Sequence, residues 1–265
     1  MSTTTYGGTL DVSQTERVPL SRLVKVELRK MADTRAAMWL LISIAAITAL
    51  VMVIMVWVAA AKDIELKFSE FLGAMSMPMG ILLPVLGVML VTQEWGQRTA
   101  MVTFSLEPRR ARIVTAKLLV GLIAGVAAVV VALVLAVIGM GLVGALGTSP
   151  EWNGSIGIVL GFLALQVIGL YTGFAFGMLF MNTAAAIVIY FAYSFVLPGI
   201  LAIGAATMKW FDKIHPWIDF GAAQQPLADG SLSGKETSHL LVSGLIWLVL
   251  PLVVGVWRML RAELK

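Results

Sequence analysis

Apolar residues fill six long stretches of this chain, and charged residues are almost absent from these stretches. A helix of about 20 apolar residues spans the hydrocarbon core of a bilayer. The predicted spans are Met38–Ala61, Gly73–Thr92, Ile113–Leu146, Ile156–Met181, Ala184–Met208 and Leu240–Trp257. The pattern therefore predicts an all-α integral membrane protein with six transmembrane helices.

Two features of the pattern concern the limits of the spans. Ile113–Leu146 is too long for one straight span at about 1.5 Å per residue, so we expect its ends to project into both aqueous phases. The fourth and fifth spans are separated only by Asn182 and Thr183. The length of this apolar run therefore predicts a tight turn at these two residues.

Lysine and arginine gather on one side of the predicted bundle. With six spans, the two termini and the loop after the second span share a side, and they hold most of the 19 basic residues. The positive-inside rule then predicts a multi-pass protein of the cell (plasma) membrane with both termini in the cytoplasm. Because the basic residues flank spans, the net charge of +4 does not indicate a nucleic-acid partner.

The segments outside the spans predict the domain organisation. Residues 1–18 are polar and rich in Thr and Ser, which predicts a disordered cytoplasmic tail. Residues 19–265 form a single six-span domain. Within it, segment 19–37 predicts an amphipathic interfacial helix, segment 93–112 a cytoplasmic coupling loop, and segment 209–239 an extracytoplasmic loop whose apolar residues favour short helices.

The two cytoplasmic segments allow different interpretations. Segment 19–37 fits a topology anchor or an elbow helix that packs beside the bundle. The loop after the second span carries Trp95 and Phe104, and a short helix presenting them would suit a groove on a partner. Pro108 favours the end of that helix just before it. Interfacial anchoring is the alternative for both aromatic residues, as it is for the basic residues that follow.

These cytoplasmic segments also resemble a known family. The motifs are Arg22–Lys30, Glu94…Arg98-Thr99 and Leu106–Lys117. They resemble the permease subunits of type-2 ABC exporters, a six-span family that includes drug-resistance and bacteriocin-immunity permeases. The resemblance is densest in residues 20–40 and 92–120. It implies that the loop after the second span forms a short coupling helix against a separate ATPase. The residues it implies for this contact are Glu94, Trp95, Arg98, Thr99, Phe104, Pro108 and Arg109.

The chain shows no nucleotide-binding loop of its own. Such a loop needs Gly-x-x-x-x-Gly-Lys-Ser/Thr, whereas Gly230–Glu236 is one residue short and ends without a hydroxyl. We therefore expect a chain that is not an enzyme, with no catalytic residue and no cofactor, and with ATP and Mg bound by a partner ATPase. The absence of cysteine and the two isolated histidines predict no metal site.

The middles of the predicted spans hold neutral polar residues. The candidates for a substrate path are Ser76, Gln166, Thr172 and Ser194. The alternative is that they form hydrogen bonds between helices. No charged residue or histidine lies in the middle of a span. This argues against ion-coupled transport, because buried charges usually mark ion paths in membranes.

Glycine and proline residues within the predicted spans indicate how the helices pack and where they bend. Glycines recur at four-residue spacing in the fourth span, from Gly157 and Gly161 to Gly169, Gly173 and Gly177. Such a ridge lets another helix approach closely, so we expect packing within the bundle along this face. Prolines in the second and fifth spans can kink them.

Two function classes follow from these features. The first is the transmembrane permease subunit of an ATP-driven ABC exporter, paired with ABC ATPase subunits and with a second six-span copy or paralogue in the lipid bilayer. Its substrate path would lie between the subunits, near the second and fifth spans. The second class is a stand-alone secondary transporter or channel, because six spans suffice for a pore. The apolar walls are compatible with a lipophilic drug, a peptide or a lipid as substrate.

Overall fold

The computed structural model of the protein describes residues 18–97, 99–107 and 109–261, and these form helices without a β-strand. In chain order the elements are α1 (Leu20–Asp33), α2 (Arg35–Lys62), α3 (Phe68–Gly96), α4 (Ala100–Leu106), α5 (Arg110–Ala145), α6 (Ile156–Phe180), α7 (Thr183–Phe191), η1 (Ala192–Val196), α8 (Leu197–Thr207), α9 (Lys209–Asp212), α10 (His215–Ile218), α11 (Phe220–Ala228), α12 (Gly234–Gly244), η2 (Leu245–Val249) and α13 (Leu250–Arg261). Elements η1 and η2 are single π-helical turns. The all-helical prediction is confirmed for the described residues.

Six helical stretches of the described chain are long and apolar enough to cross a bilayer, namely α2, α3, α5, α6, α7 to α8, and α12 to α13. They correspond in order to the six predicted spans, as expected for a multi-pass membrane protein. The third stretch, α5, is one helix of 36 residues. At about 1.5 Å per residue it is roughly 54 Å long, which exceeds the ~30 Å hydrocarbon core as predicted.

The predicted tight turn between the fourth and fifth spans is present. Helix α6 ends at Phe180, and Met181 adopts a left-handed backbone conformation. The side-chain oxygen of Asn182 then accepts a hydrogen bond from the backbone N–H of Ala185 at 3.0 Å. This cap satisfies one of the N–H groups that a helix start leaves without a partner. The chain therefore reverses direction without a loop.

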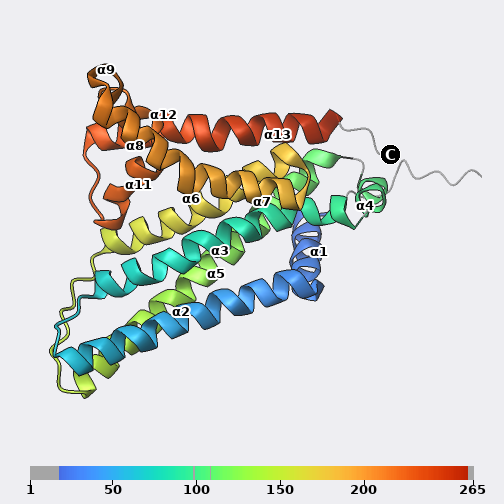
Figure 1. Ribbon diagram of the computed structural model, residues 1–265. Helices are drawn as coiled ribbons and strands as arrows, with labels where there is room; N and C mark the ends of the chain where they lie inside the picture. The colour runs from blue at the N-terminus through green and yellow to red at the C-terminus, as the bar shows by residue number, and fades with distance from the viewer. Residues whose placement is uncertain (1–17, 98, 108, 262–265) are drawn as a thin grey trace, which may run out of the picture.

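Figure 1 shows the long helices running side by side, with different short elements at the two ends of the bundle. Helix α1 lies across one end, where α4 and the C-terminal end of α13 are also found. We call this the α1 end. The connections 63–67, 146–155 and 208–233 lie at the opposite end, which carries α9 to α11 and which we call the α9 end.

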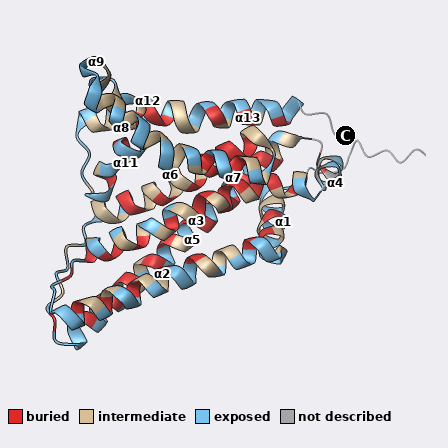
Figure 2. Ribbon diagram, in the orientation of Figure 1, coloured by how far each residue is buried: buried red, intermediate tan, exposed pale blue. Residues whose placement is uncertain are grey.

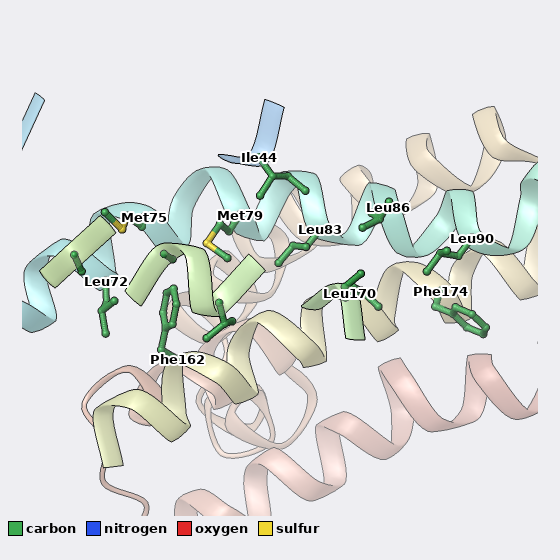
Figure 3. Close-up of a cluster of buried hydrophobic side chains, with 14 of the residues drawn as sticks. Ile44, Leu72, Met75, Met79, Leu83, Leu86, Leu90, Phe162, Leu170 and Phe174 are labelled. Atoms are coloured by element: carbon green, nitrogen blue, oxygen red, sulfur yellow. The ribbon is translucent and has the colours of Figure 1, made fainter. Parts of the chain in front are cut away.

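Helices α3 and α6 form the centre of the bundle, and they pack along each other. Figure 2 shows buried residues concentrated on these helices and exposed residues on α2 and α13. In the most apolar window of α3, 50% of the residues are buried inside the subunit, against 11% in the stretch α7 to α8. Side chains that fill the centre include Met79, Leu83, Leu170 and Phe174 (Figure 3).

The glycine ridge of the fourth span makes this close packing possible. A Cβ atom added at Gly173 would lie 2.0 Å from the carbonyl oxygen of Pro84 in α3. One added at Gly161 would lie 1.8 Å from the carbonyl oxygen of Leu227 in α11. Any larger residue at either position would overlap with backbone. The prediction that the ridge packs within the bundle is therefore confirmed.

Two predicted loops are shorter in the structure, because helices extend into them. Ser233 and Glu236 form a capping box in which each side chain accepts a hydrogen bond from the backbone N–H of the other, so residues 234–239 belong to the helix of the sixth span. Helices α3 and α5 likewise extend into the predicted loop 93–112 and leave α4 between them. Glu94 consequently lies in the last turns of α3.

Candidate functional site

Four charged side chains meet at the α1 end, and we call them the ionic cluster: Glu27 and Lys30 of α1, Glu94 of α3 and Lys117 of α5. Lys117 Nζ lies 2.7 Å from Glu27 Oε2 and 3.4 Å from Glu94 Oε1. Lys30 Nζ lies 2.6 Å from Glu27 Oε1 and 2.8 Å from Glu94 Oε1. Each lysine therefore bridges both glutamates, and the formal charges cancel.

Most of the ionic cluster is buried. The side chains of Lys117, Glu27 and Glu94 are only 5%, 8% and 8% exposed, whereas that of Lys30 is 38% exposed. Lys117 also donates a hydrogen bond to the carbonyl oxygen of Leu90 at 3.0 Å. Removing one partner from such a buried pair is costly, about 3–5 kcal/mol, because the remaining charge loses its compensation. The cluster therefore holds α1 against the ends of α3 and α5.

Electrostatics keep the more exposed lysine charged. Partial burial by itself lowers the pKa of Lys30, but hydrogen bonds and charge attraction from Glu27 and Glu94 outweigh it and raise this pKa above its ordinary value. The ammonium group therefore stays protonated at neutral pH. Its charge is available to both glutamates under physiological conditions.

Helix α4 is joined to the same cluster. The hydroxyl of Thr103 donates a hydrogen bond to Glu94 Oε1 at 3.1 Å. On the other side of α4, Glu107 pairs with Arg112, with 2.7 Å between Oε2 and Nη1, and Arg112 also donates to the carbonyl oxygen of Val18. Arg110 donates to the carbonyl oxygen of Met259 at 3.0 Å. These contacts connect α3, α4, α5, α13 and the residue Val18 before α1 at one end of the bundle.

A cleft of about 700 Å³ opens between α1 and α4, above the ionic cluster. Its floor contains the four charged residues, and Val26 and Val102 contribute apolar walls. Val102 is 60% exposed, and the neighbouring Met101 is 52% exposed. Arg22 and Arg29 are exposed on the α1 side of the cleft. The cleft therefore combines exposed apolar side chains with exposed charged ones, and among the latter Arg29 pairs with Asp33 at 3.9 Å.

The residues predicted to couple to a partner lie in different environments. Glu94 is buried in the ionic cluster, and Trp95 is partly buried against the core. Thr99 and Arg109 are exposed at the N-terminal caps of α4 and α5. The predictions for Arg98, Pro108 and the side chain of Phe104 lie outside the described residues.

The ionic cluster itself was not predicted from the sequence. Lys117 was interpreted as one of several basic residues that anchor the third span, yet its side chain points into protein. A signal was present in α1, where Leu23, Glu27 and Met31 recur every four residues and therefore share a face. A glutamate on the apolar face of an amphipathic helix requires a buried cationic partner.

The four neutral residues predicted at depth come together around one cavity. Ser76, Gln166, Thr172 and Ser194 all line a cavity of about 250 Å³ between α3, α6 and η1. The side-chain amide of Gln166 donates a hydrogen bond to the hydroxyl of Ser76 at 3.3 Å. The hydroxyl of Thr172 donates to the carbonyl oxygen of Ile168 in its own helix. Gln166 therefore joins two helices and also lines the cavity, while its place on a substrate path stays a prediction.

Aromatic side chains and the short helices of the α9 end complete this cavity. The rings of Tyr193 in η1 and Trp247 in η2 lie 4.9 Å apart, centroid to centroid. Trp247 Nε1 donates a hydrogen bond to the carbonyl oxygen of Ile218 at 2.7 Å. The carboxylate of Asp219 caps α11 by accepting a hydrogen bond from the N–H of Ala222 at 2.9 Å. Trp247 and Asp219 were not among the predicted site residues.

In the part of the chain that the structure describes, no group of three or more His, Asp or Glu side chains is placed to hold a metal ion. Neither a protein-family model nor a curated protein sequence matches this chain.

Proposed function

We propose that this chain is the transmembrane permease subunit of an ATP-driven type-2 ABC exporter, and that a separate ATPase subunit docks at the cleft between α1 and α4. The observation that carries the proposal is the ionic cluster. It ties the two surface helices that border the cleft to the ends of α3 and α5. A partner that moves α1 or α4 would therefore move the second and third spans.

The transmission rests on short and well-anchored connections. Helix α4 is linked to α3 and α5 by only a few residues on each side. The hydrogen bond from Thr103 to Glu94 and the pair between Glu107 and Arg112 restrict its position relative to both. Coupling between sites needs an element whose position differs between two states. In this proposal α4 is that element. Glu94 positions α4 by accepting the hydrogen bond of Thr103, and it does not itself contact the partner.

The surface of the cleft indicates the chemistry of the partner. Exposed Met101 and Val102 on α4 favour a partner that contributes apolar side chains. The exposed Arg22 at the cleft favours acidic residues on the partner, because complementary charges speed association and select partners. We expect the ATPase to present a helix with an apolar centre and an acidic border. The α1 end is then the cytoplasmic end, in agreement with the positive-inside rule.

A second copy or a paralogue would complete the path in the plasma membrane. The stretch α7 to α8 buries few residues in its own subunit and exposes Phe195, Ile200 and Ile203. This face suits either lipid or a second permease subunit. The cavity lined by Gln166 and Ser194 lies on the inner side of the same stretch. We therefore assign the substrate path to the region between α3 and α8.

One observation favours the stand-alone transporter, namely the titratable groups buried at the helix ends. Intramembrane charges often belong to ion or proton relays. The ionic cluster, however, is formally neutral, and each of its members is paired. It also lies at the α1 end, away from the cavity. Flux that is driven by an ion gradient without ATP, and lost in Lys117→Met, would favour this alternative.

Cysteine cross-linking tests the docking surface directly, because the chain contains no native cysteine. The test uses Val102→Cys in α4 and, as a matched control, Trp210→Cys at the α9 end, whose side chains are 60% and 61% exposed. Each variant is co-expressed with a candidate ATPase subunit that carries cysteines along its surface. We expect cross-links from Val102→Cys alone. Cross-links from neither site, or from Trp210→Cys only, would refute the proposed docking.

A further inference from the structure

The cavity near the α9 end has a composition that selects one kind of ligand. Among the described residues that line it, Asp219 is the sole side chain with a formal charge at neutral pH. The remaining lining is apolar, aromatic or neutral and polar. Asp219 is itself only 5% exposed. An anion would be repelled by this carboxylate, whereas a cation would be attracted to it.

Aromatic rings form the wall that faces the same space. Tyr193 lies between Tyr190 and Trp247, with ring centroids 6.1 Å and 4.9 Å away. All three side chains line the cavity. The face of an aromatic ring carries partial negative charge, so rings of this kind attract cations, and tryptophan is the strongest. Recognition of quaternary ammonium groups by such aromatic walls needs no hydrogen-bond donor on the ligand.

The two π-helical turns place these residues at the cavity. Pro198 lacks the N–H that would bond to the carbonyl of Ser194 in a regular helix, and Pro251 lacks the one that would bond to the carbonyl of Trp247. The chain forms a π turn before each proline instead. In both helices the residue four positions before the proline lines the cavity. The prolines thus locally rewind both helices at the positions where Ser194 and Trp247 line the cavity.

The carboxylate of Asp219 still has capacity for a ligand. Its Oδ1 accepts from the N–H of Ala222 at 2.9 Å, and its Oδ2 lies 3.0 Å from His215 Nε2. A carboxylate offers about four lone-pair positions, so two contacts do not saturate it. Capping of α11 explains why an aspartate stands here, but it does not explain why three aromatic rings surround the same space.

The geometry points to a binding site for a small organic cation, such as a quaternary ammonium or lipophilic amine, in the cavity that Tyr193, Trp247 and Asp219 line. The volume of about 250 Å³ lies just below the ~300–1,000 Å³ of pockets for drug-sized ligands, which favours a compact cation. This inference deepens the proposed function by naming the substrate class. The binding site itself does not depend on the proposed function. The interpretation of the cation as an exported substrate rests on that function.

Binding to the purified chain in lipid nanodiscs, without any ATPase, tests the site. The probe is benzyltrimethylammonium, and its neutral control is neopentylbenzene, which has the same shape without the charge. Calorimetry should detect saturable binding of the cation and much weaker binding of the neutral compound. Equal affinity for both compounds, or no binding of the cation, would overturn the inference.

Variants locate the site and separate charge from packing. Asp219→Asn keeps an oxygen that can cap α11 and should weaken cation binding about tenfold, while it leaves the neutral compound unaffected. Trp247→Leu should weaken it by a similar factor, because a desolvated cation–π contact is worth about one decade in affinity. Tyr193→Phe keeps the ring and should bind normally. Unchanged cation binding in both Asp219→Asn and Trp247→Leu would refute the site.

The binding measurement and the cross-linking experiment together distinguish the cation site from the exporter assignment. Cation binding with the expected variant pattern, together with failure of Val102→Cys to cross-link to an ATPase, would retain the cation site and remove the exporter assignment. Cross-linking of Val102→Cys without cation binding would retain the exporter assignment and remove the cation site.

Discussion

The ionic cluster at the α1 end and the cavity near the α9 end are built from different kinds of contact. The α1 end is held by four charged side chains that come from α1, α3 and α5 and are paired within 3.4 Å. The cavity near the α9 end is lined by neutral and aromatic groups, with one carboxylate at its edge. The first arrangement fixes helices relative to one another, and the second leaves a space between them.

The difference shows how one bundle can combine a rigid part with an adaptable part. Buried ion pairs demand specific geometry, because a displaced charge loses both its partner and its solvation. Aromatic walls and π turns tolerate rearrangement, and π turns often occur at functional sites. We therefore expect perturbations at the α1 end to change stability strongly, and perturbations at the cavity to change ligand binding with a smaller effect on stability.

The largest expected effect comes from Lys117→Met at the α1 end. The substitution leaves Glu27 and Glu94 buried with only one cationic partner, so the free energy of unfolding should fall by about 3–5 kcal/mol. Thermal unfolding of the protein in micelles measures this. Lys67→Met is the control at the α9 end, where it breaks the exposed pair with Glu151 at 3.1 Å and should not shift the transition. Equal shifts in the two variants would contradict the comparison.

A second variant keeps this prediction testable if Lys117→Met does not fold. Combining Lys117→Met with Glu27→Gln removes one charge of each sign and leaves Lys30 paired with Glu94. The double variant should recover part of the lost stability, because the remaining charges again cancel. A further loss of stability would show that packing, and not charge, dominates at this position.

An intermediate effect is expected in the core that connects the two ends. Gly173→Ala places a Cβ atom against the carbonyl oxygen of Pro84, where only 2.0 Å is available. The helices α3 and α6 must move apart, and the expected loss is about 1–3 kcal/mol. Gly73→Ala in the same bundle meets no atom within 4 Å and should be neutral or slightly stabilising. Chemical denaturation measures the unfolding midpoint of each variant. Equal midpoints for Gly173→Ala and Gly73→Ala would contradict the prediction.

A smaller effect is expected for Ser76→Ala at the cavity. It removes the hydroxyl that accepts the hydrogen bond of Gln166, and such interhelical bonds in membranes average about 0.6 kcal/mol. Ser238→Ala removes an exposed hydroxyl that bonds within α12 and serves as the control. A loss comparable to that of Lys117→Met would mean that the cavity is as rigidly held as the α1 end.

The smallest effect concerns alkaline pH. The pKa of Lys30 is raised above its ordinary value of 10.5 in the folded protein. Its contribution to stability is therefore complete below pH 10.5 and is lost as the pH rises through the higher folded pKa. Wild type should lose more stability than Lys30→Met over this range, while Lys25→Met, which removes an exposed lysine of the same helix, should follow wild type. Parallel curves for wild type and Lys30→Met would disprove this.

Much of the fold was predictable because hydropathy and local chemistry act along the chain. The six apolar stretches had to become helices, since a bilayer offers no other partner for their backbone groups. The length of the apolar run predicted the turn at Asn182, and in the structure the side chain of this residue caps α7. The glycines of α6 predicted a close helix contact, and the structure places Gly161 and Gly173 against the backbone of α11 and α3. Ser76 and Gln166 were identified as polar residues at depth before their hydrogen bond was known.

Only the tertiary structure decided which distant residues meet. Glu27 and Lys117 are 90 positions apart, and the apolar face that carries Glu27 indicates a cationic partner without identifying it. The path of α1 across the end of the bundle decides which cation reaches Glu27. The hydropathy pattern does not specify this path. Trp247 and Asp219 reach the cavity through a π turn and a capped short helix. The amino-acid sequence determined the six apolar stretches, because each crossing of a bilayer requires about 20 apolar residues. The mutual packing of the helices determined which side chains share a site.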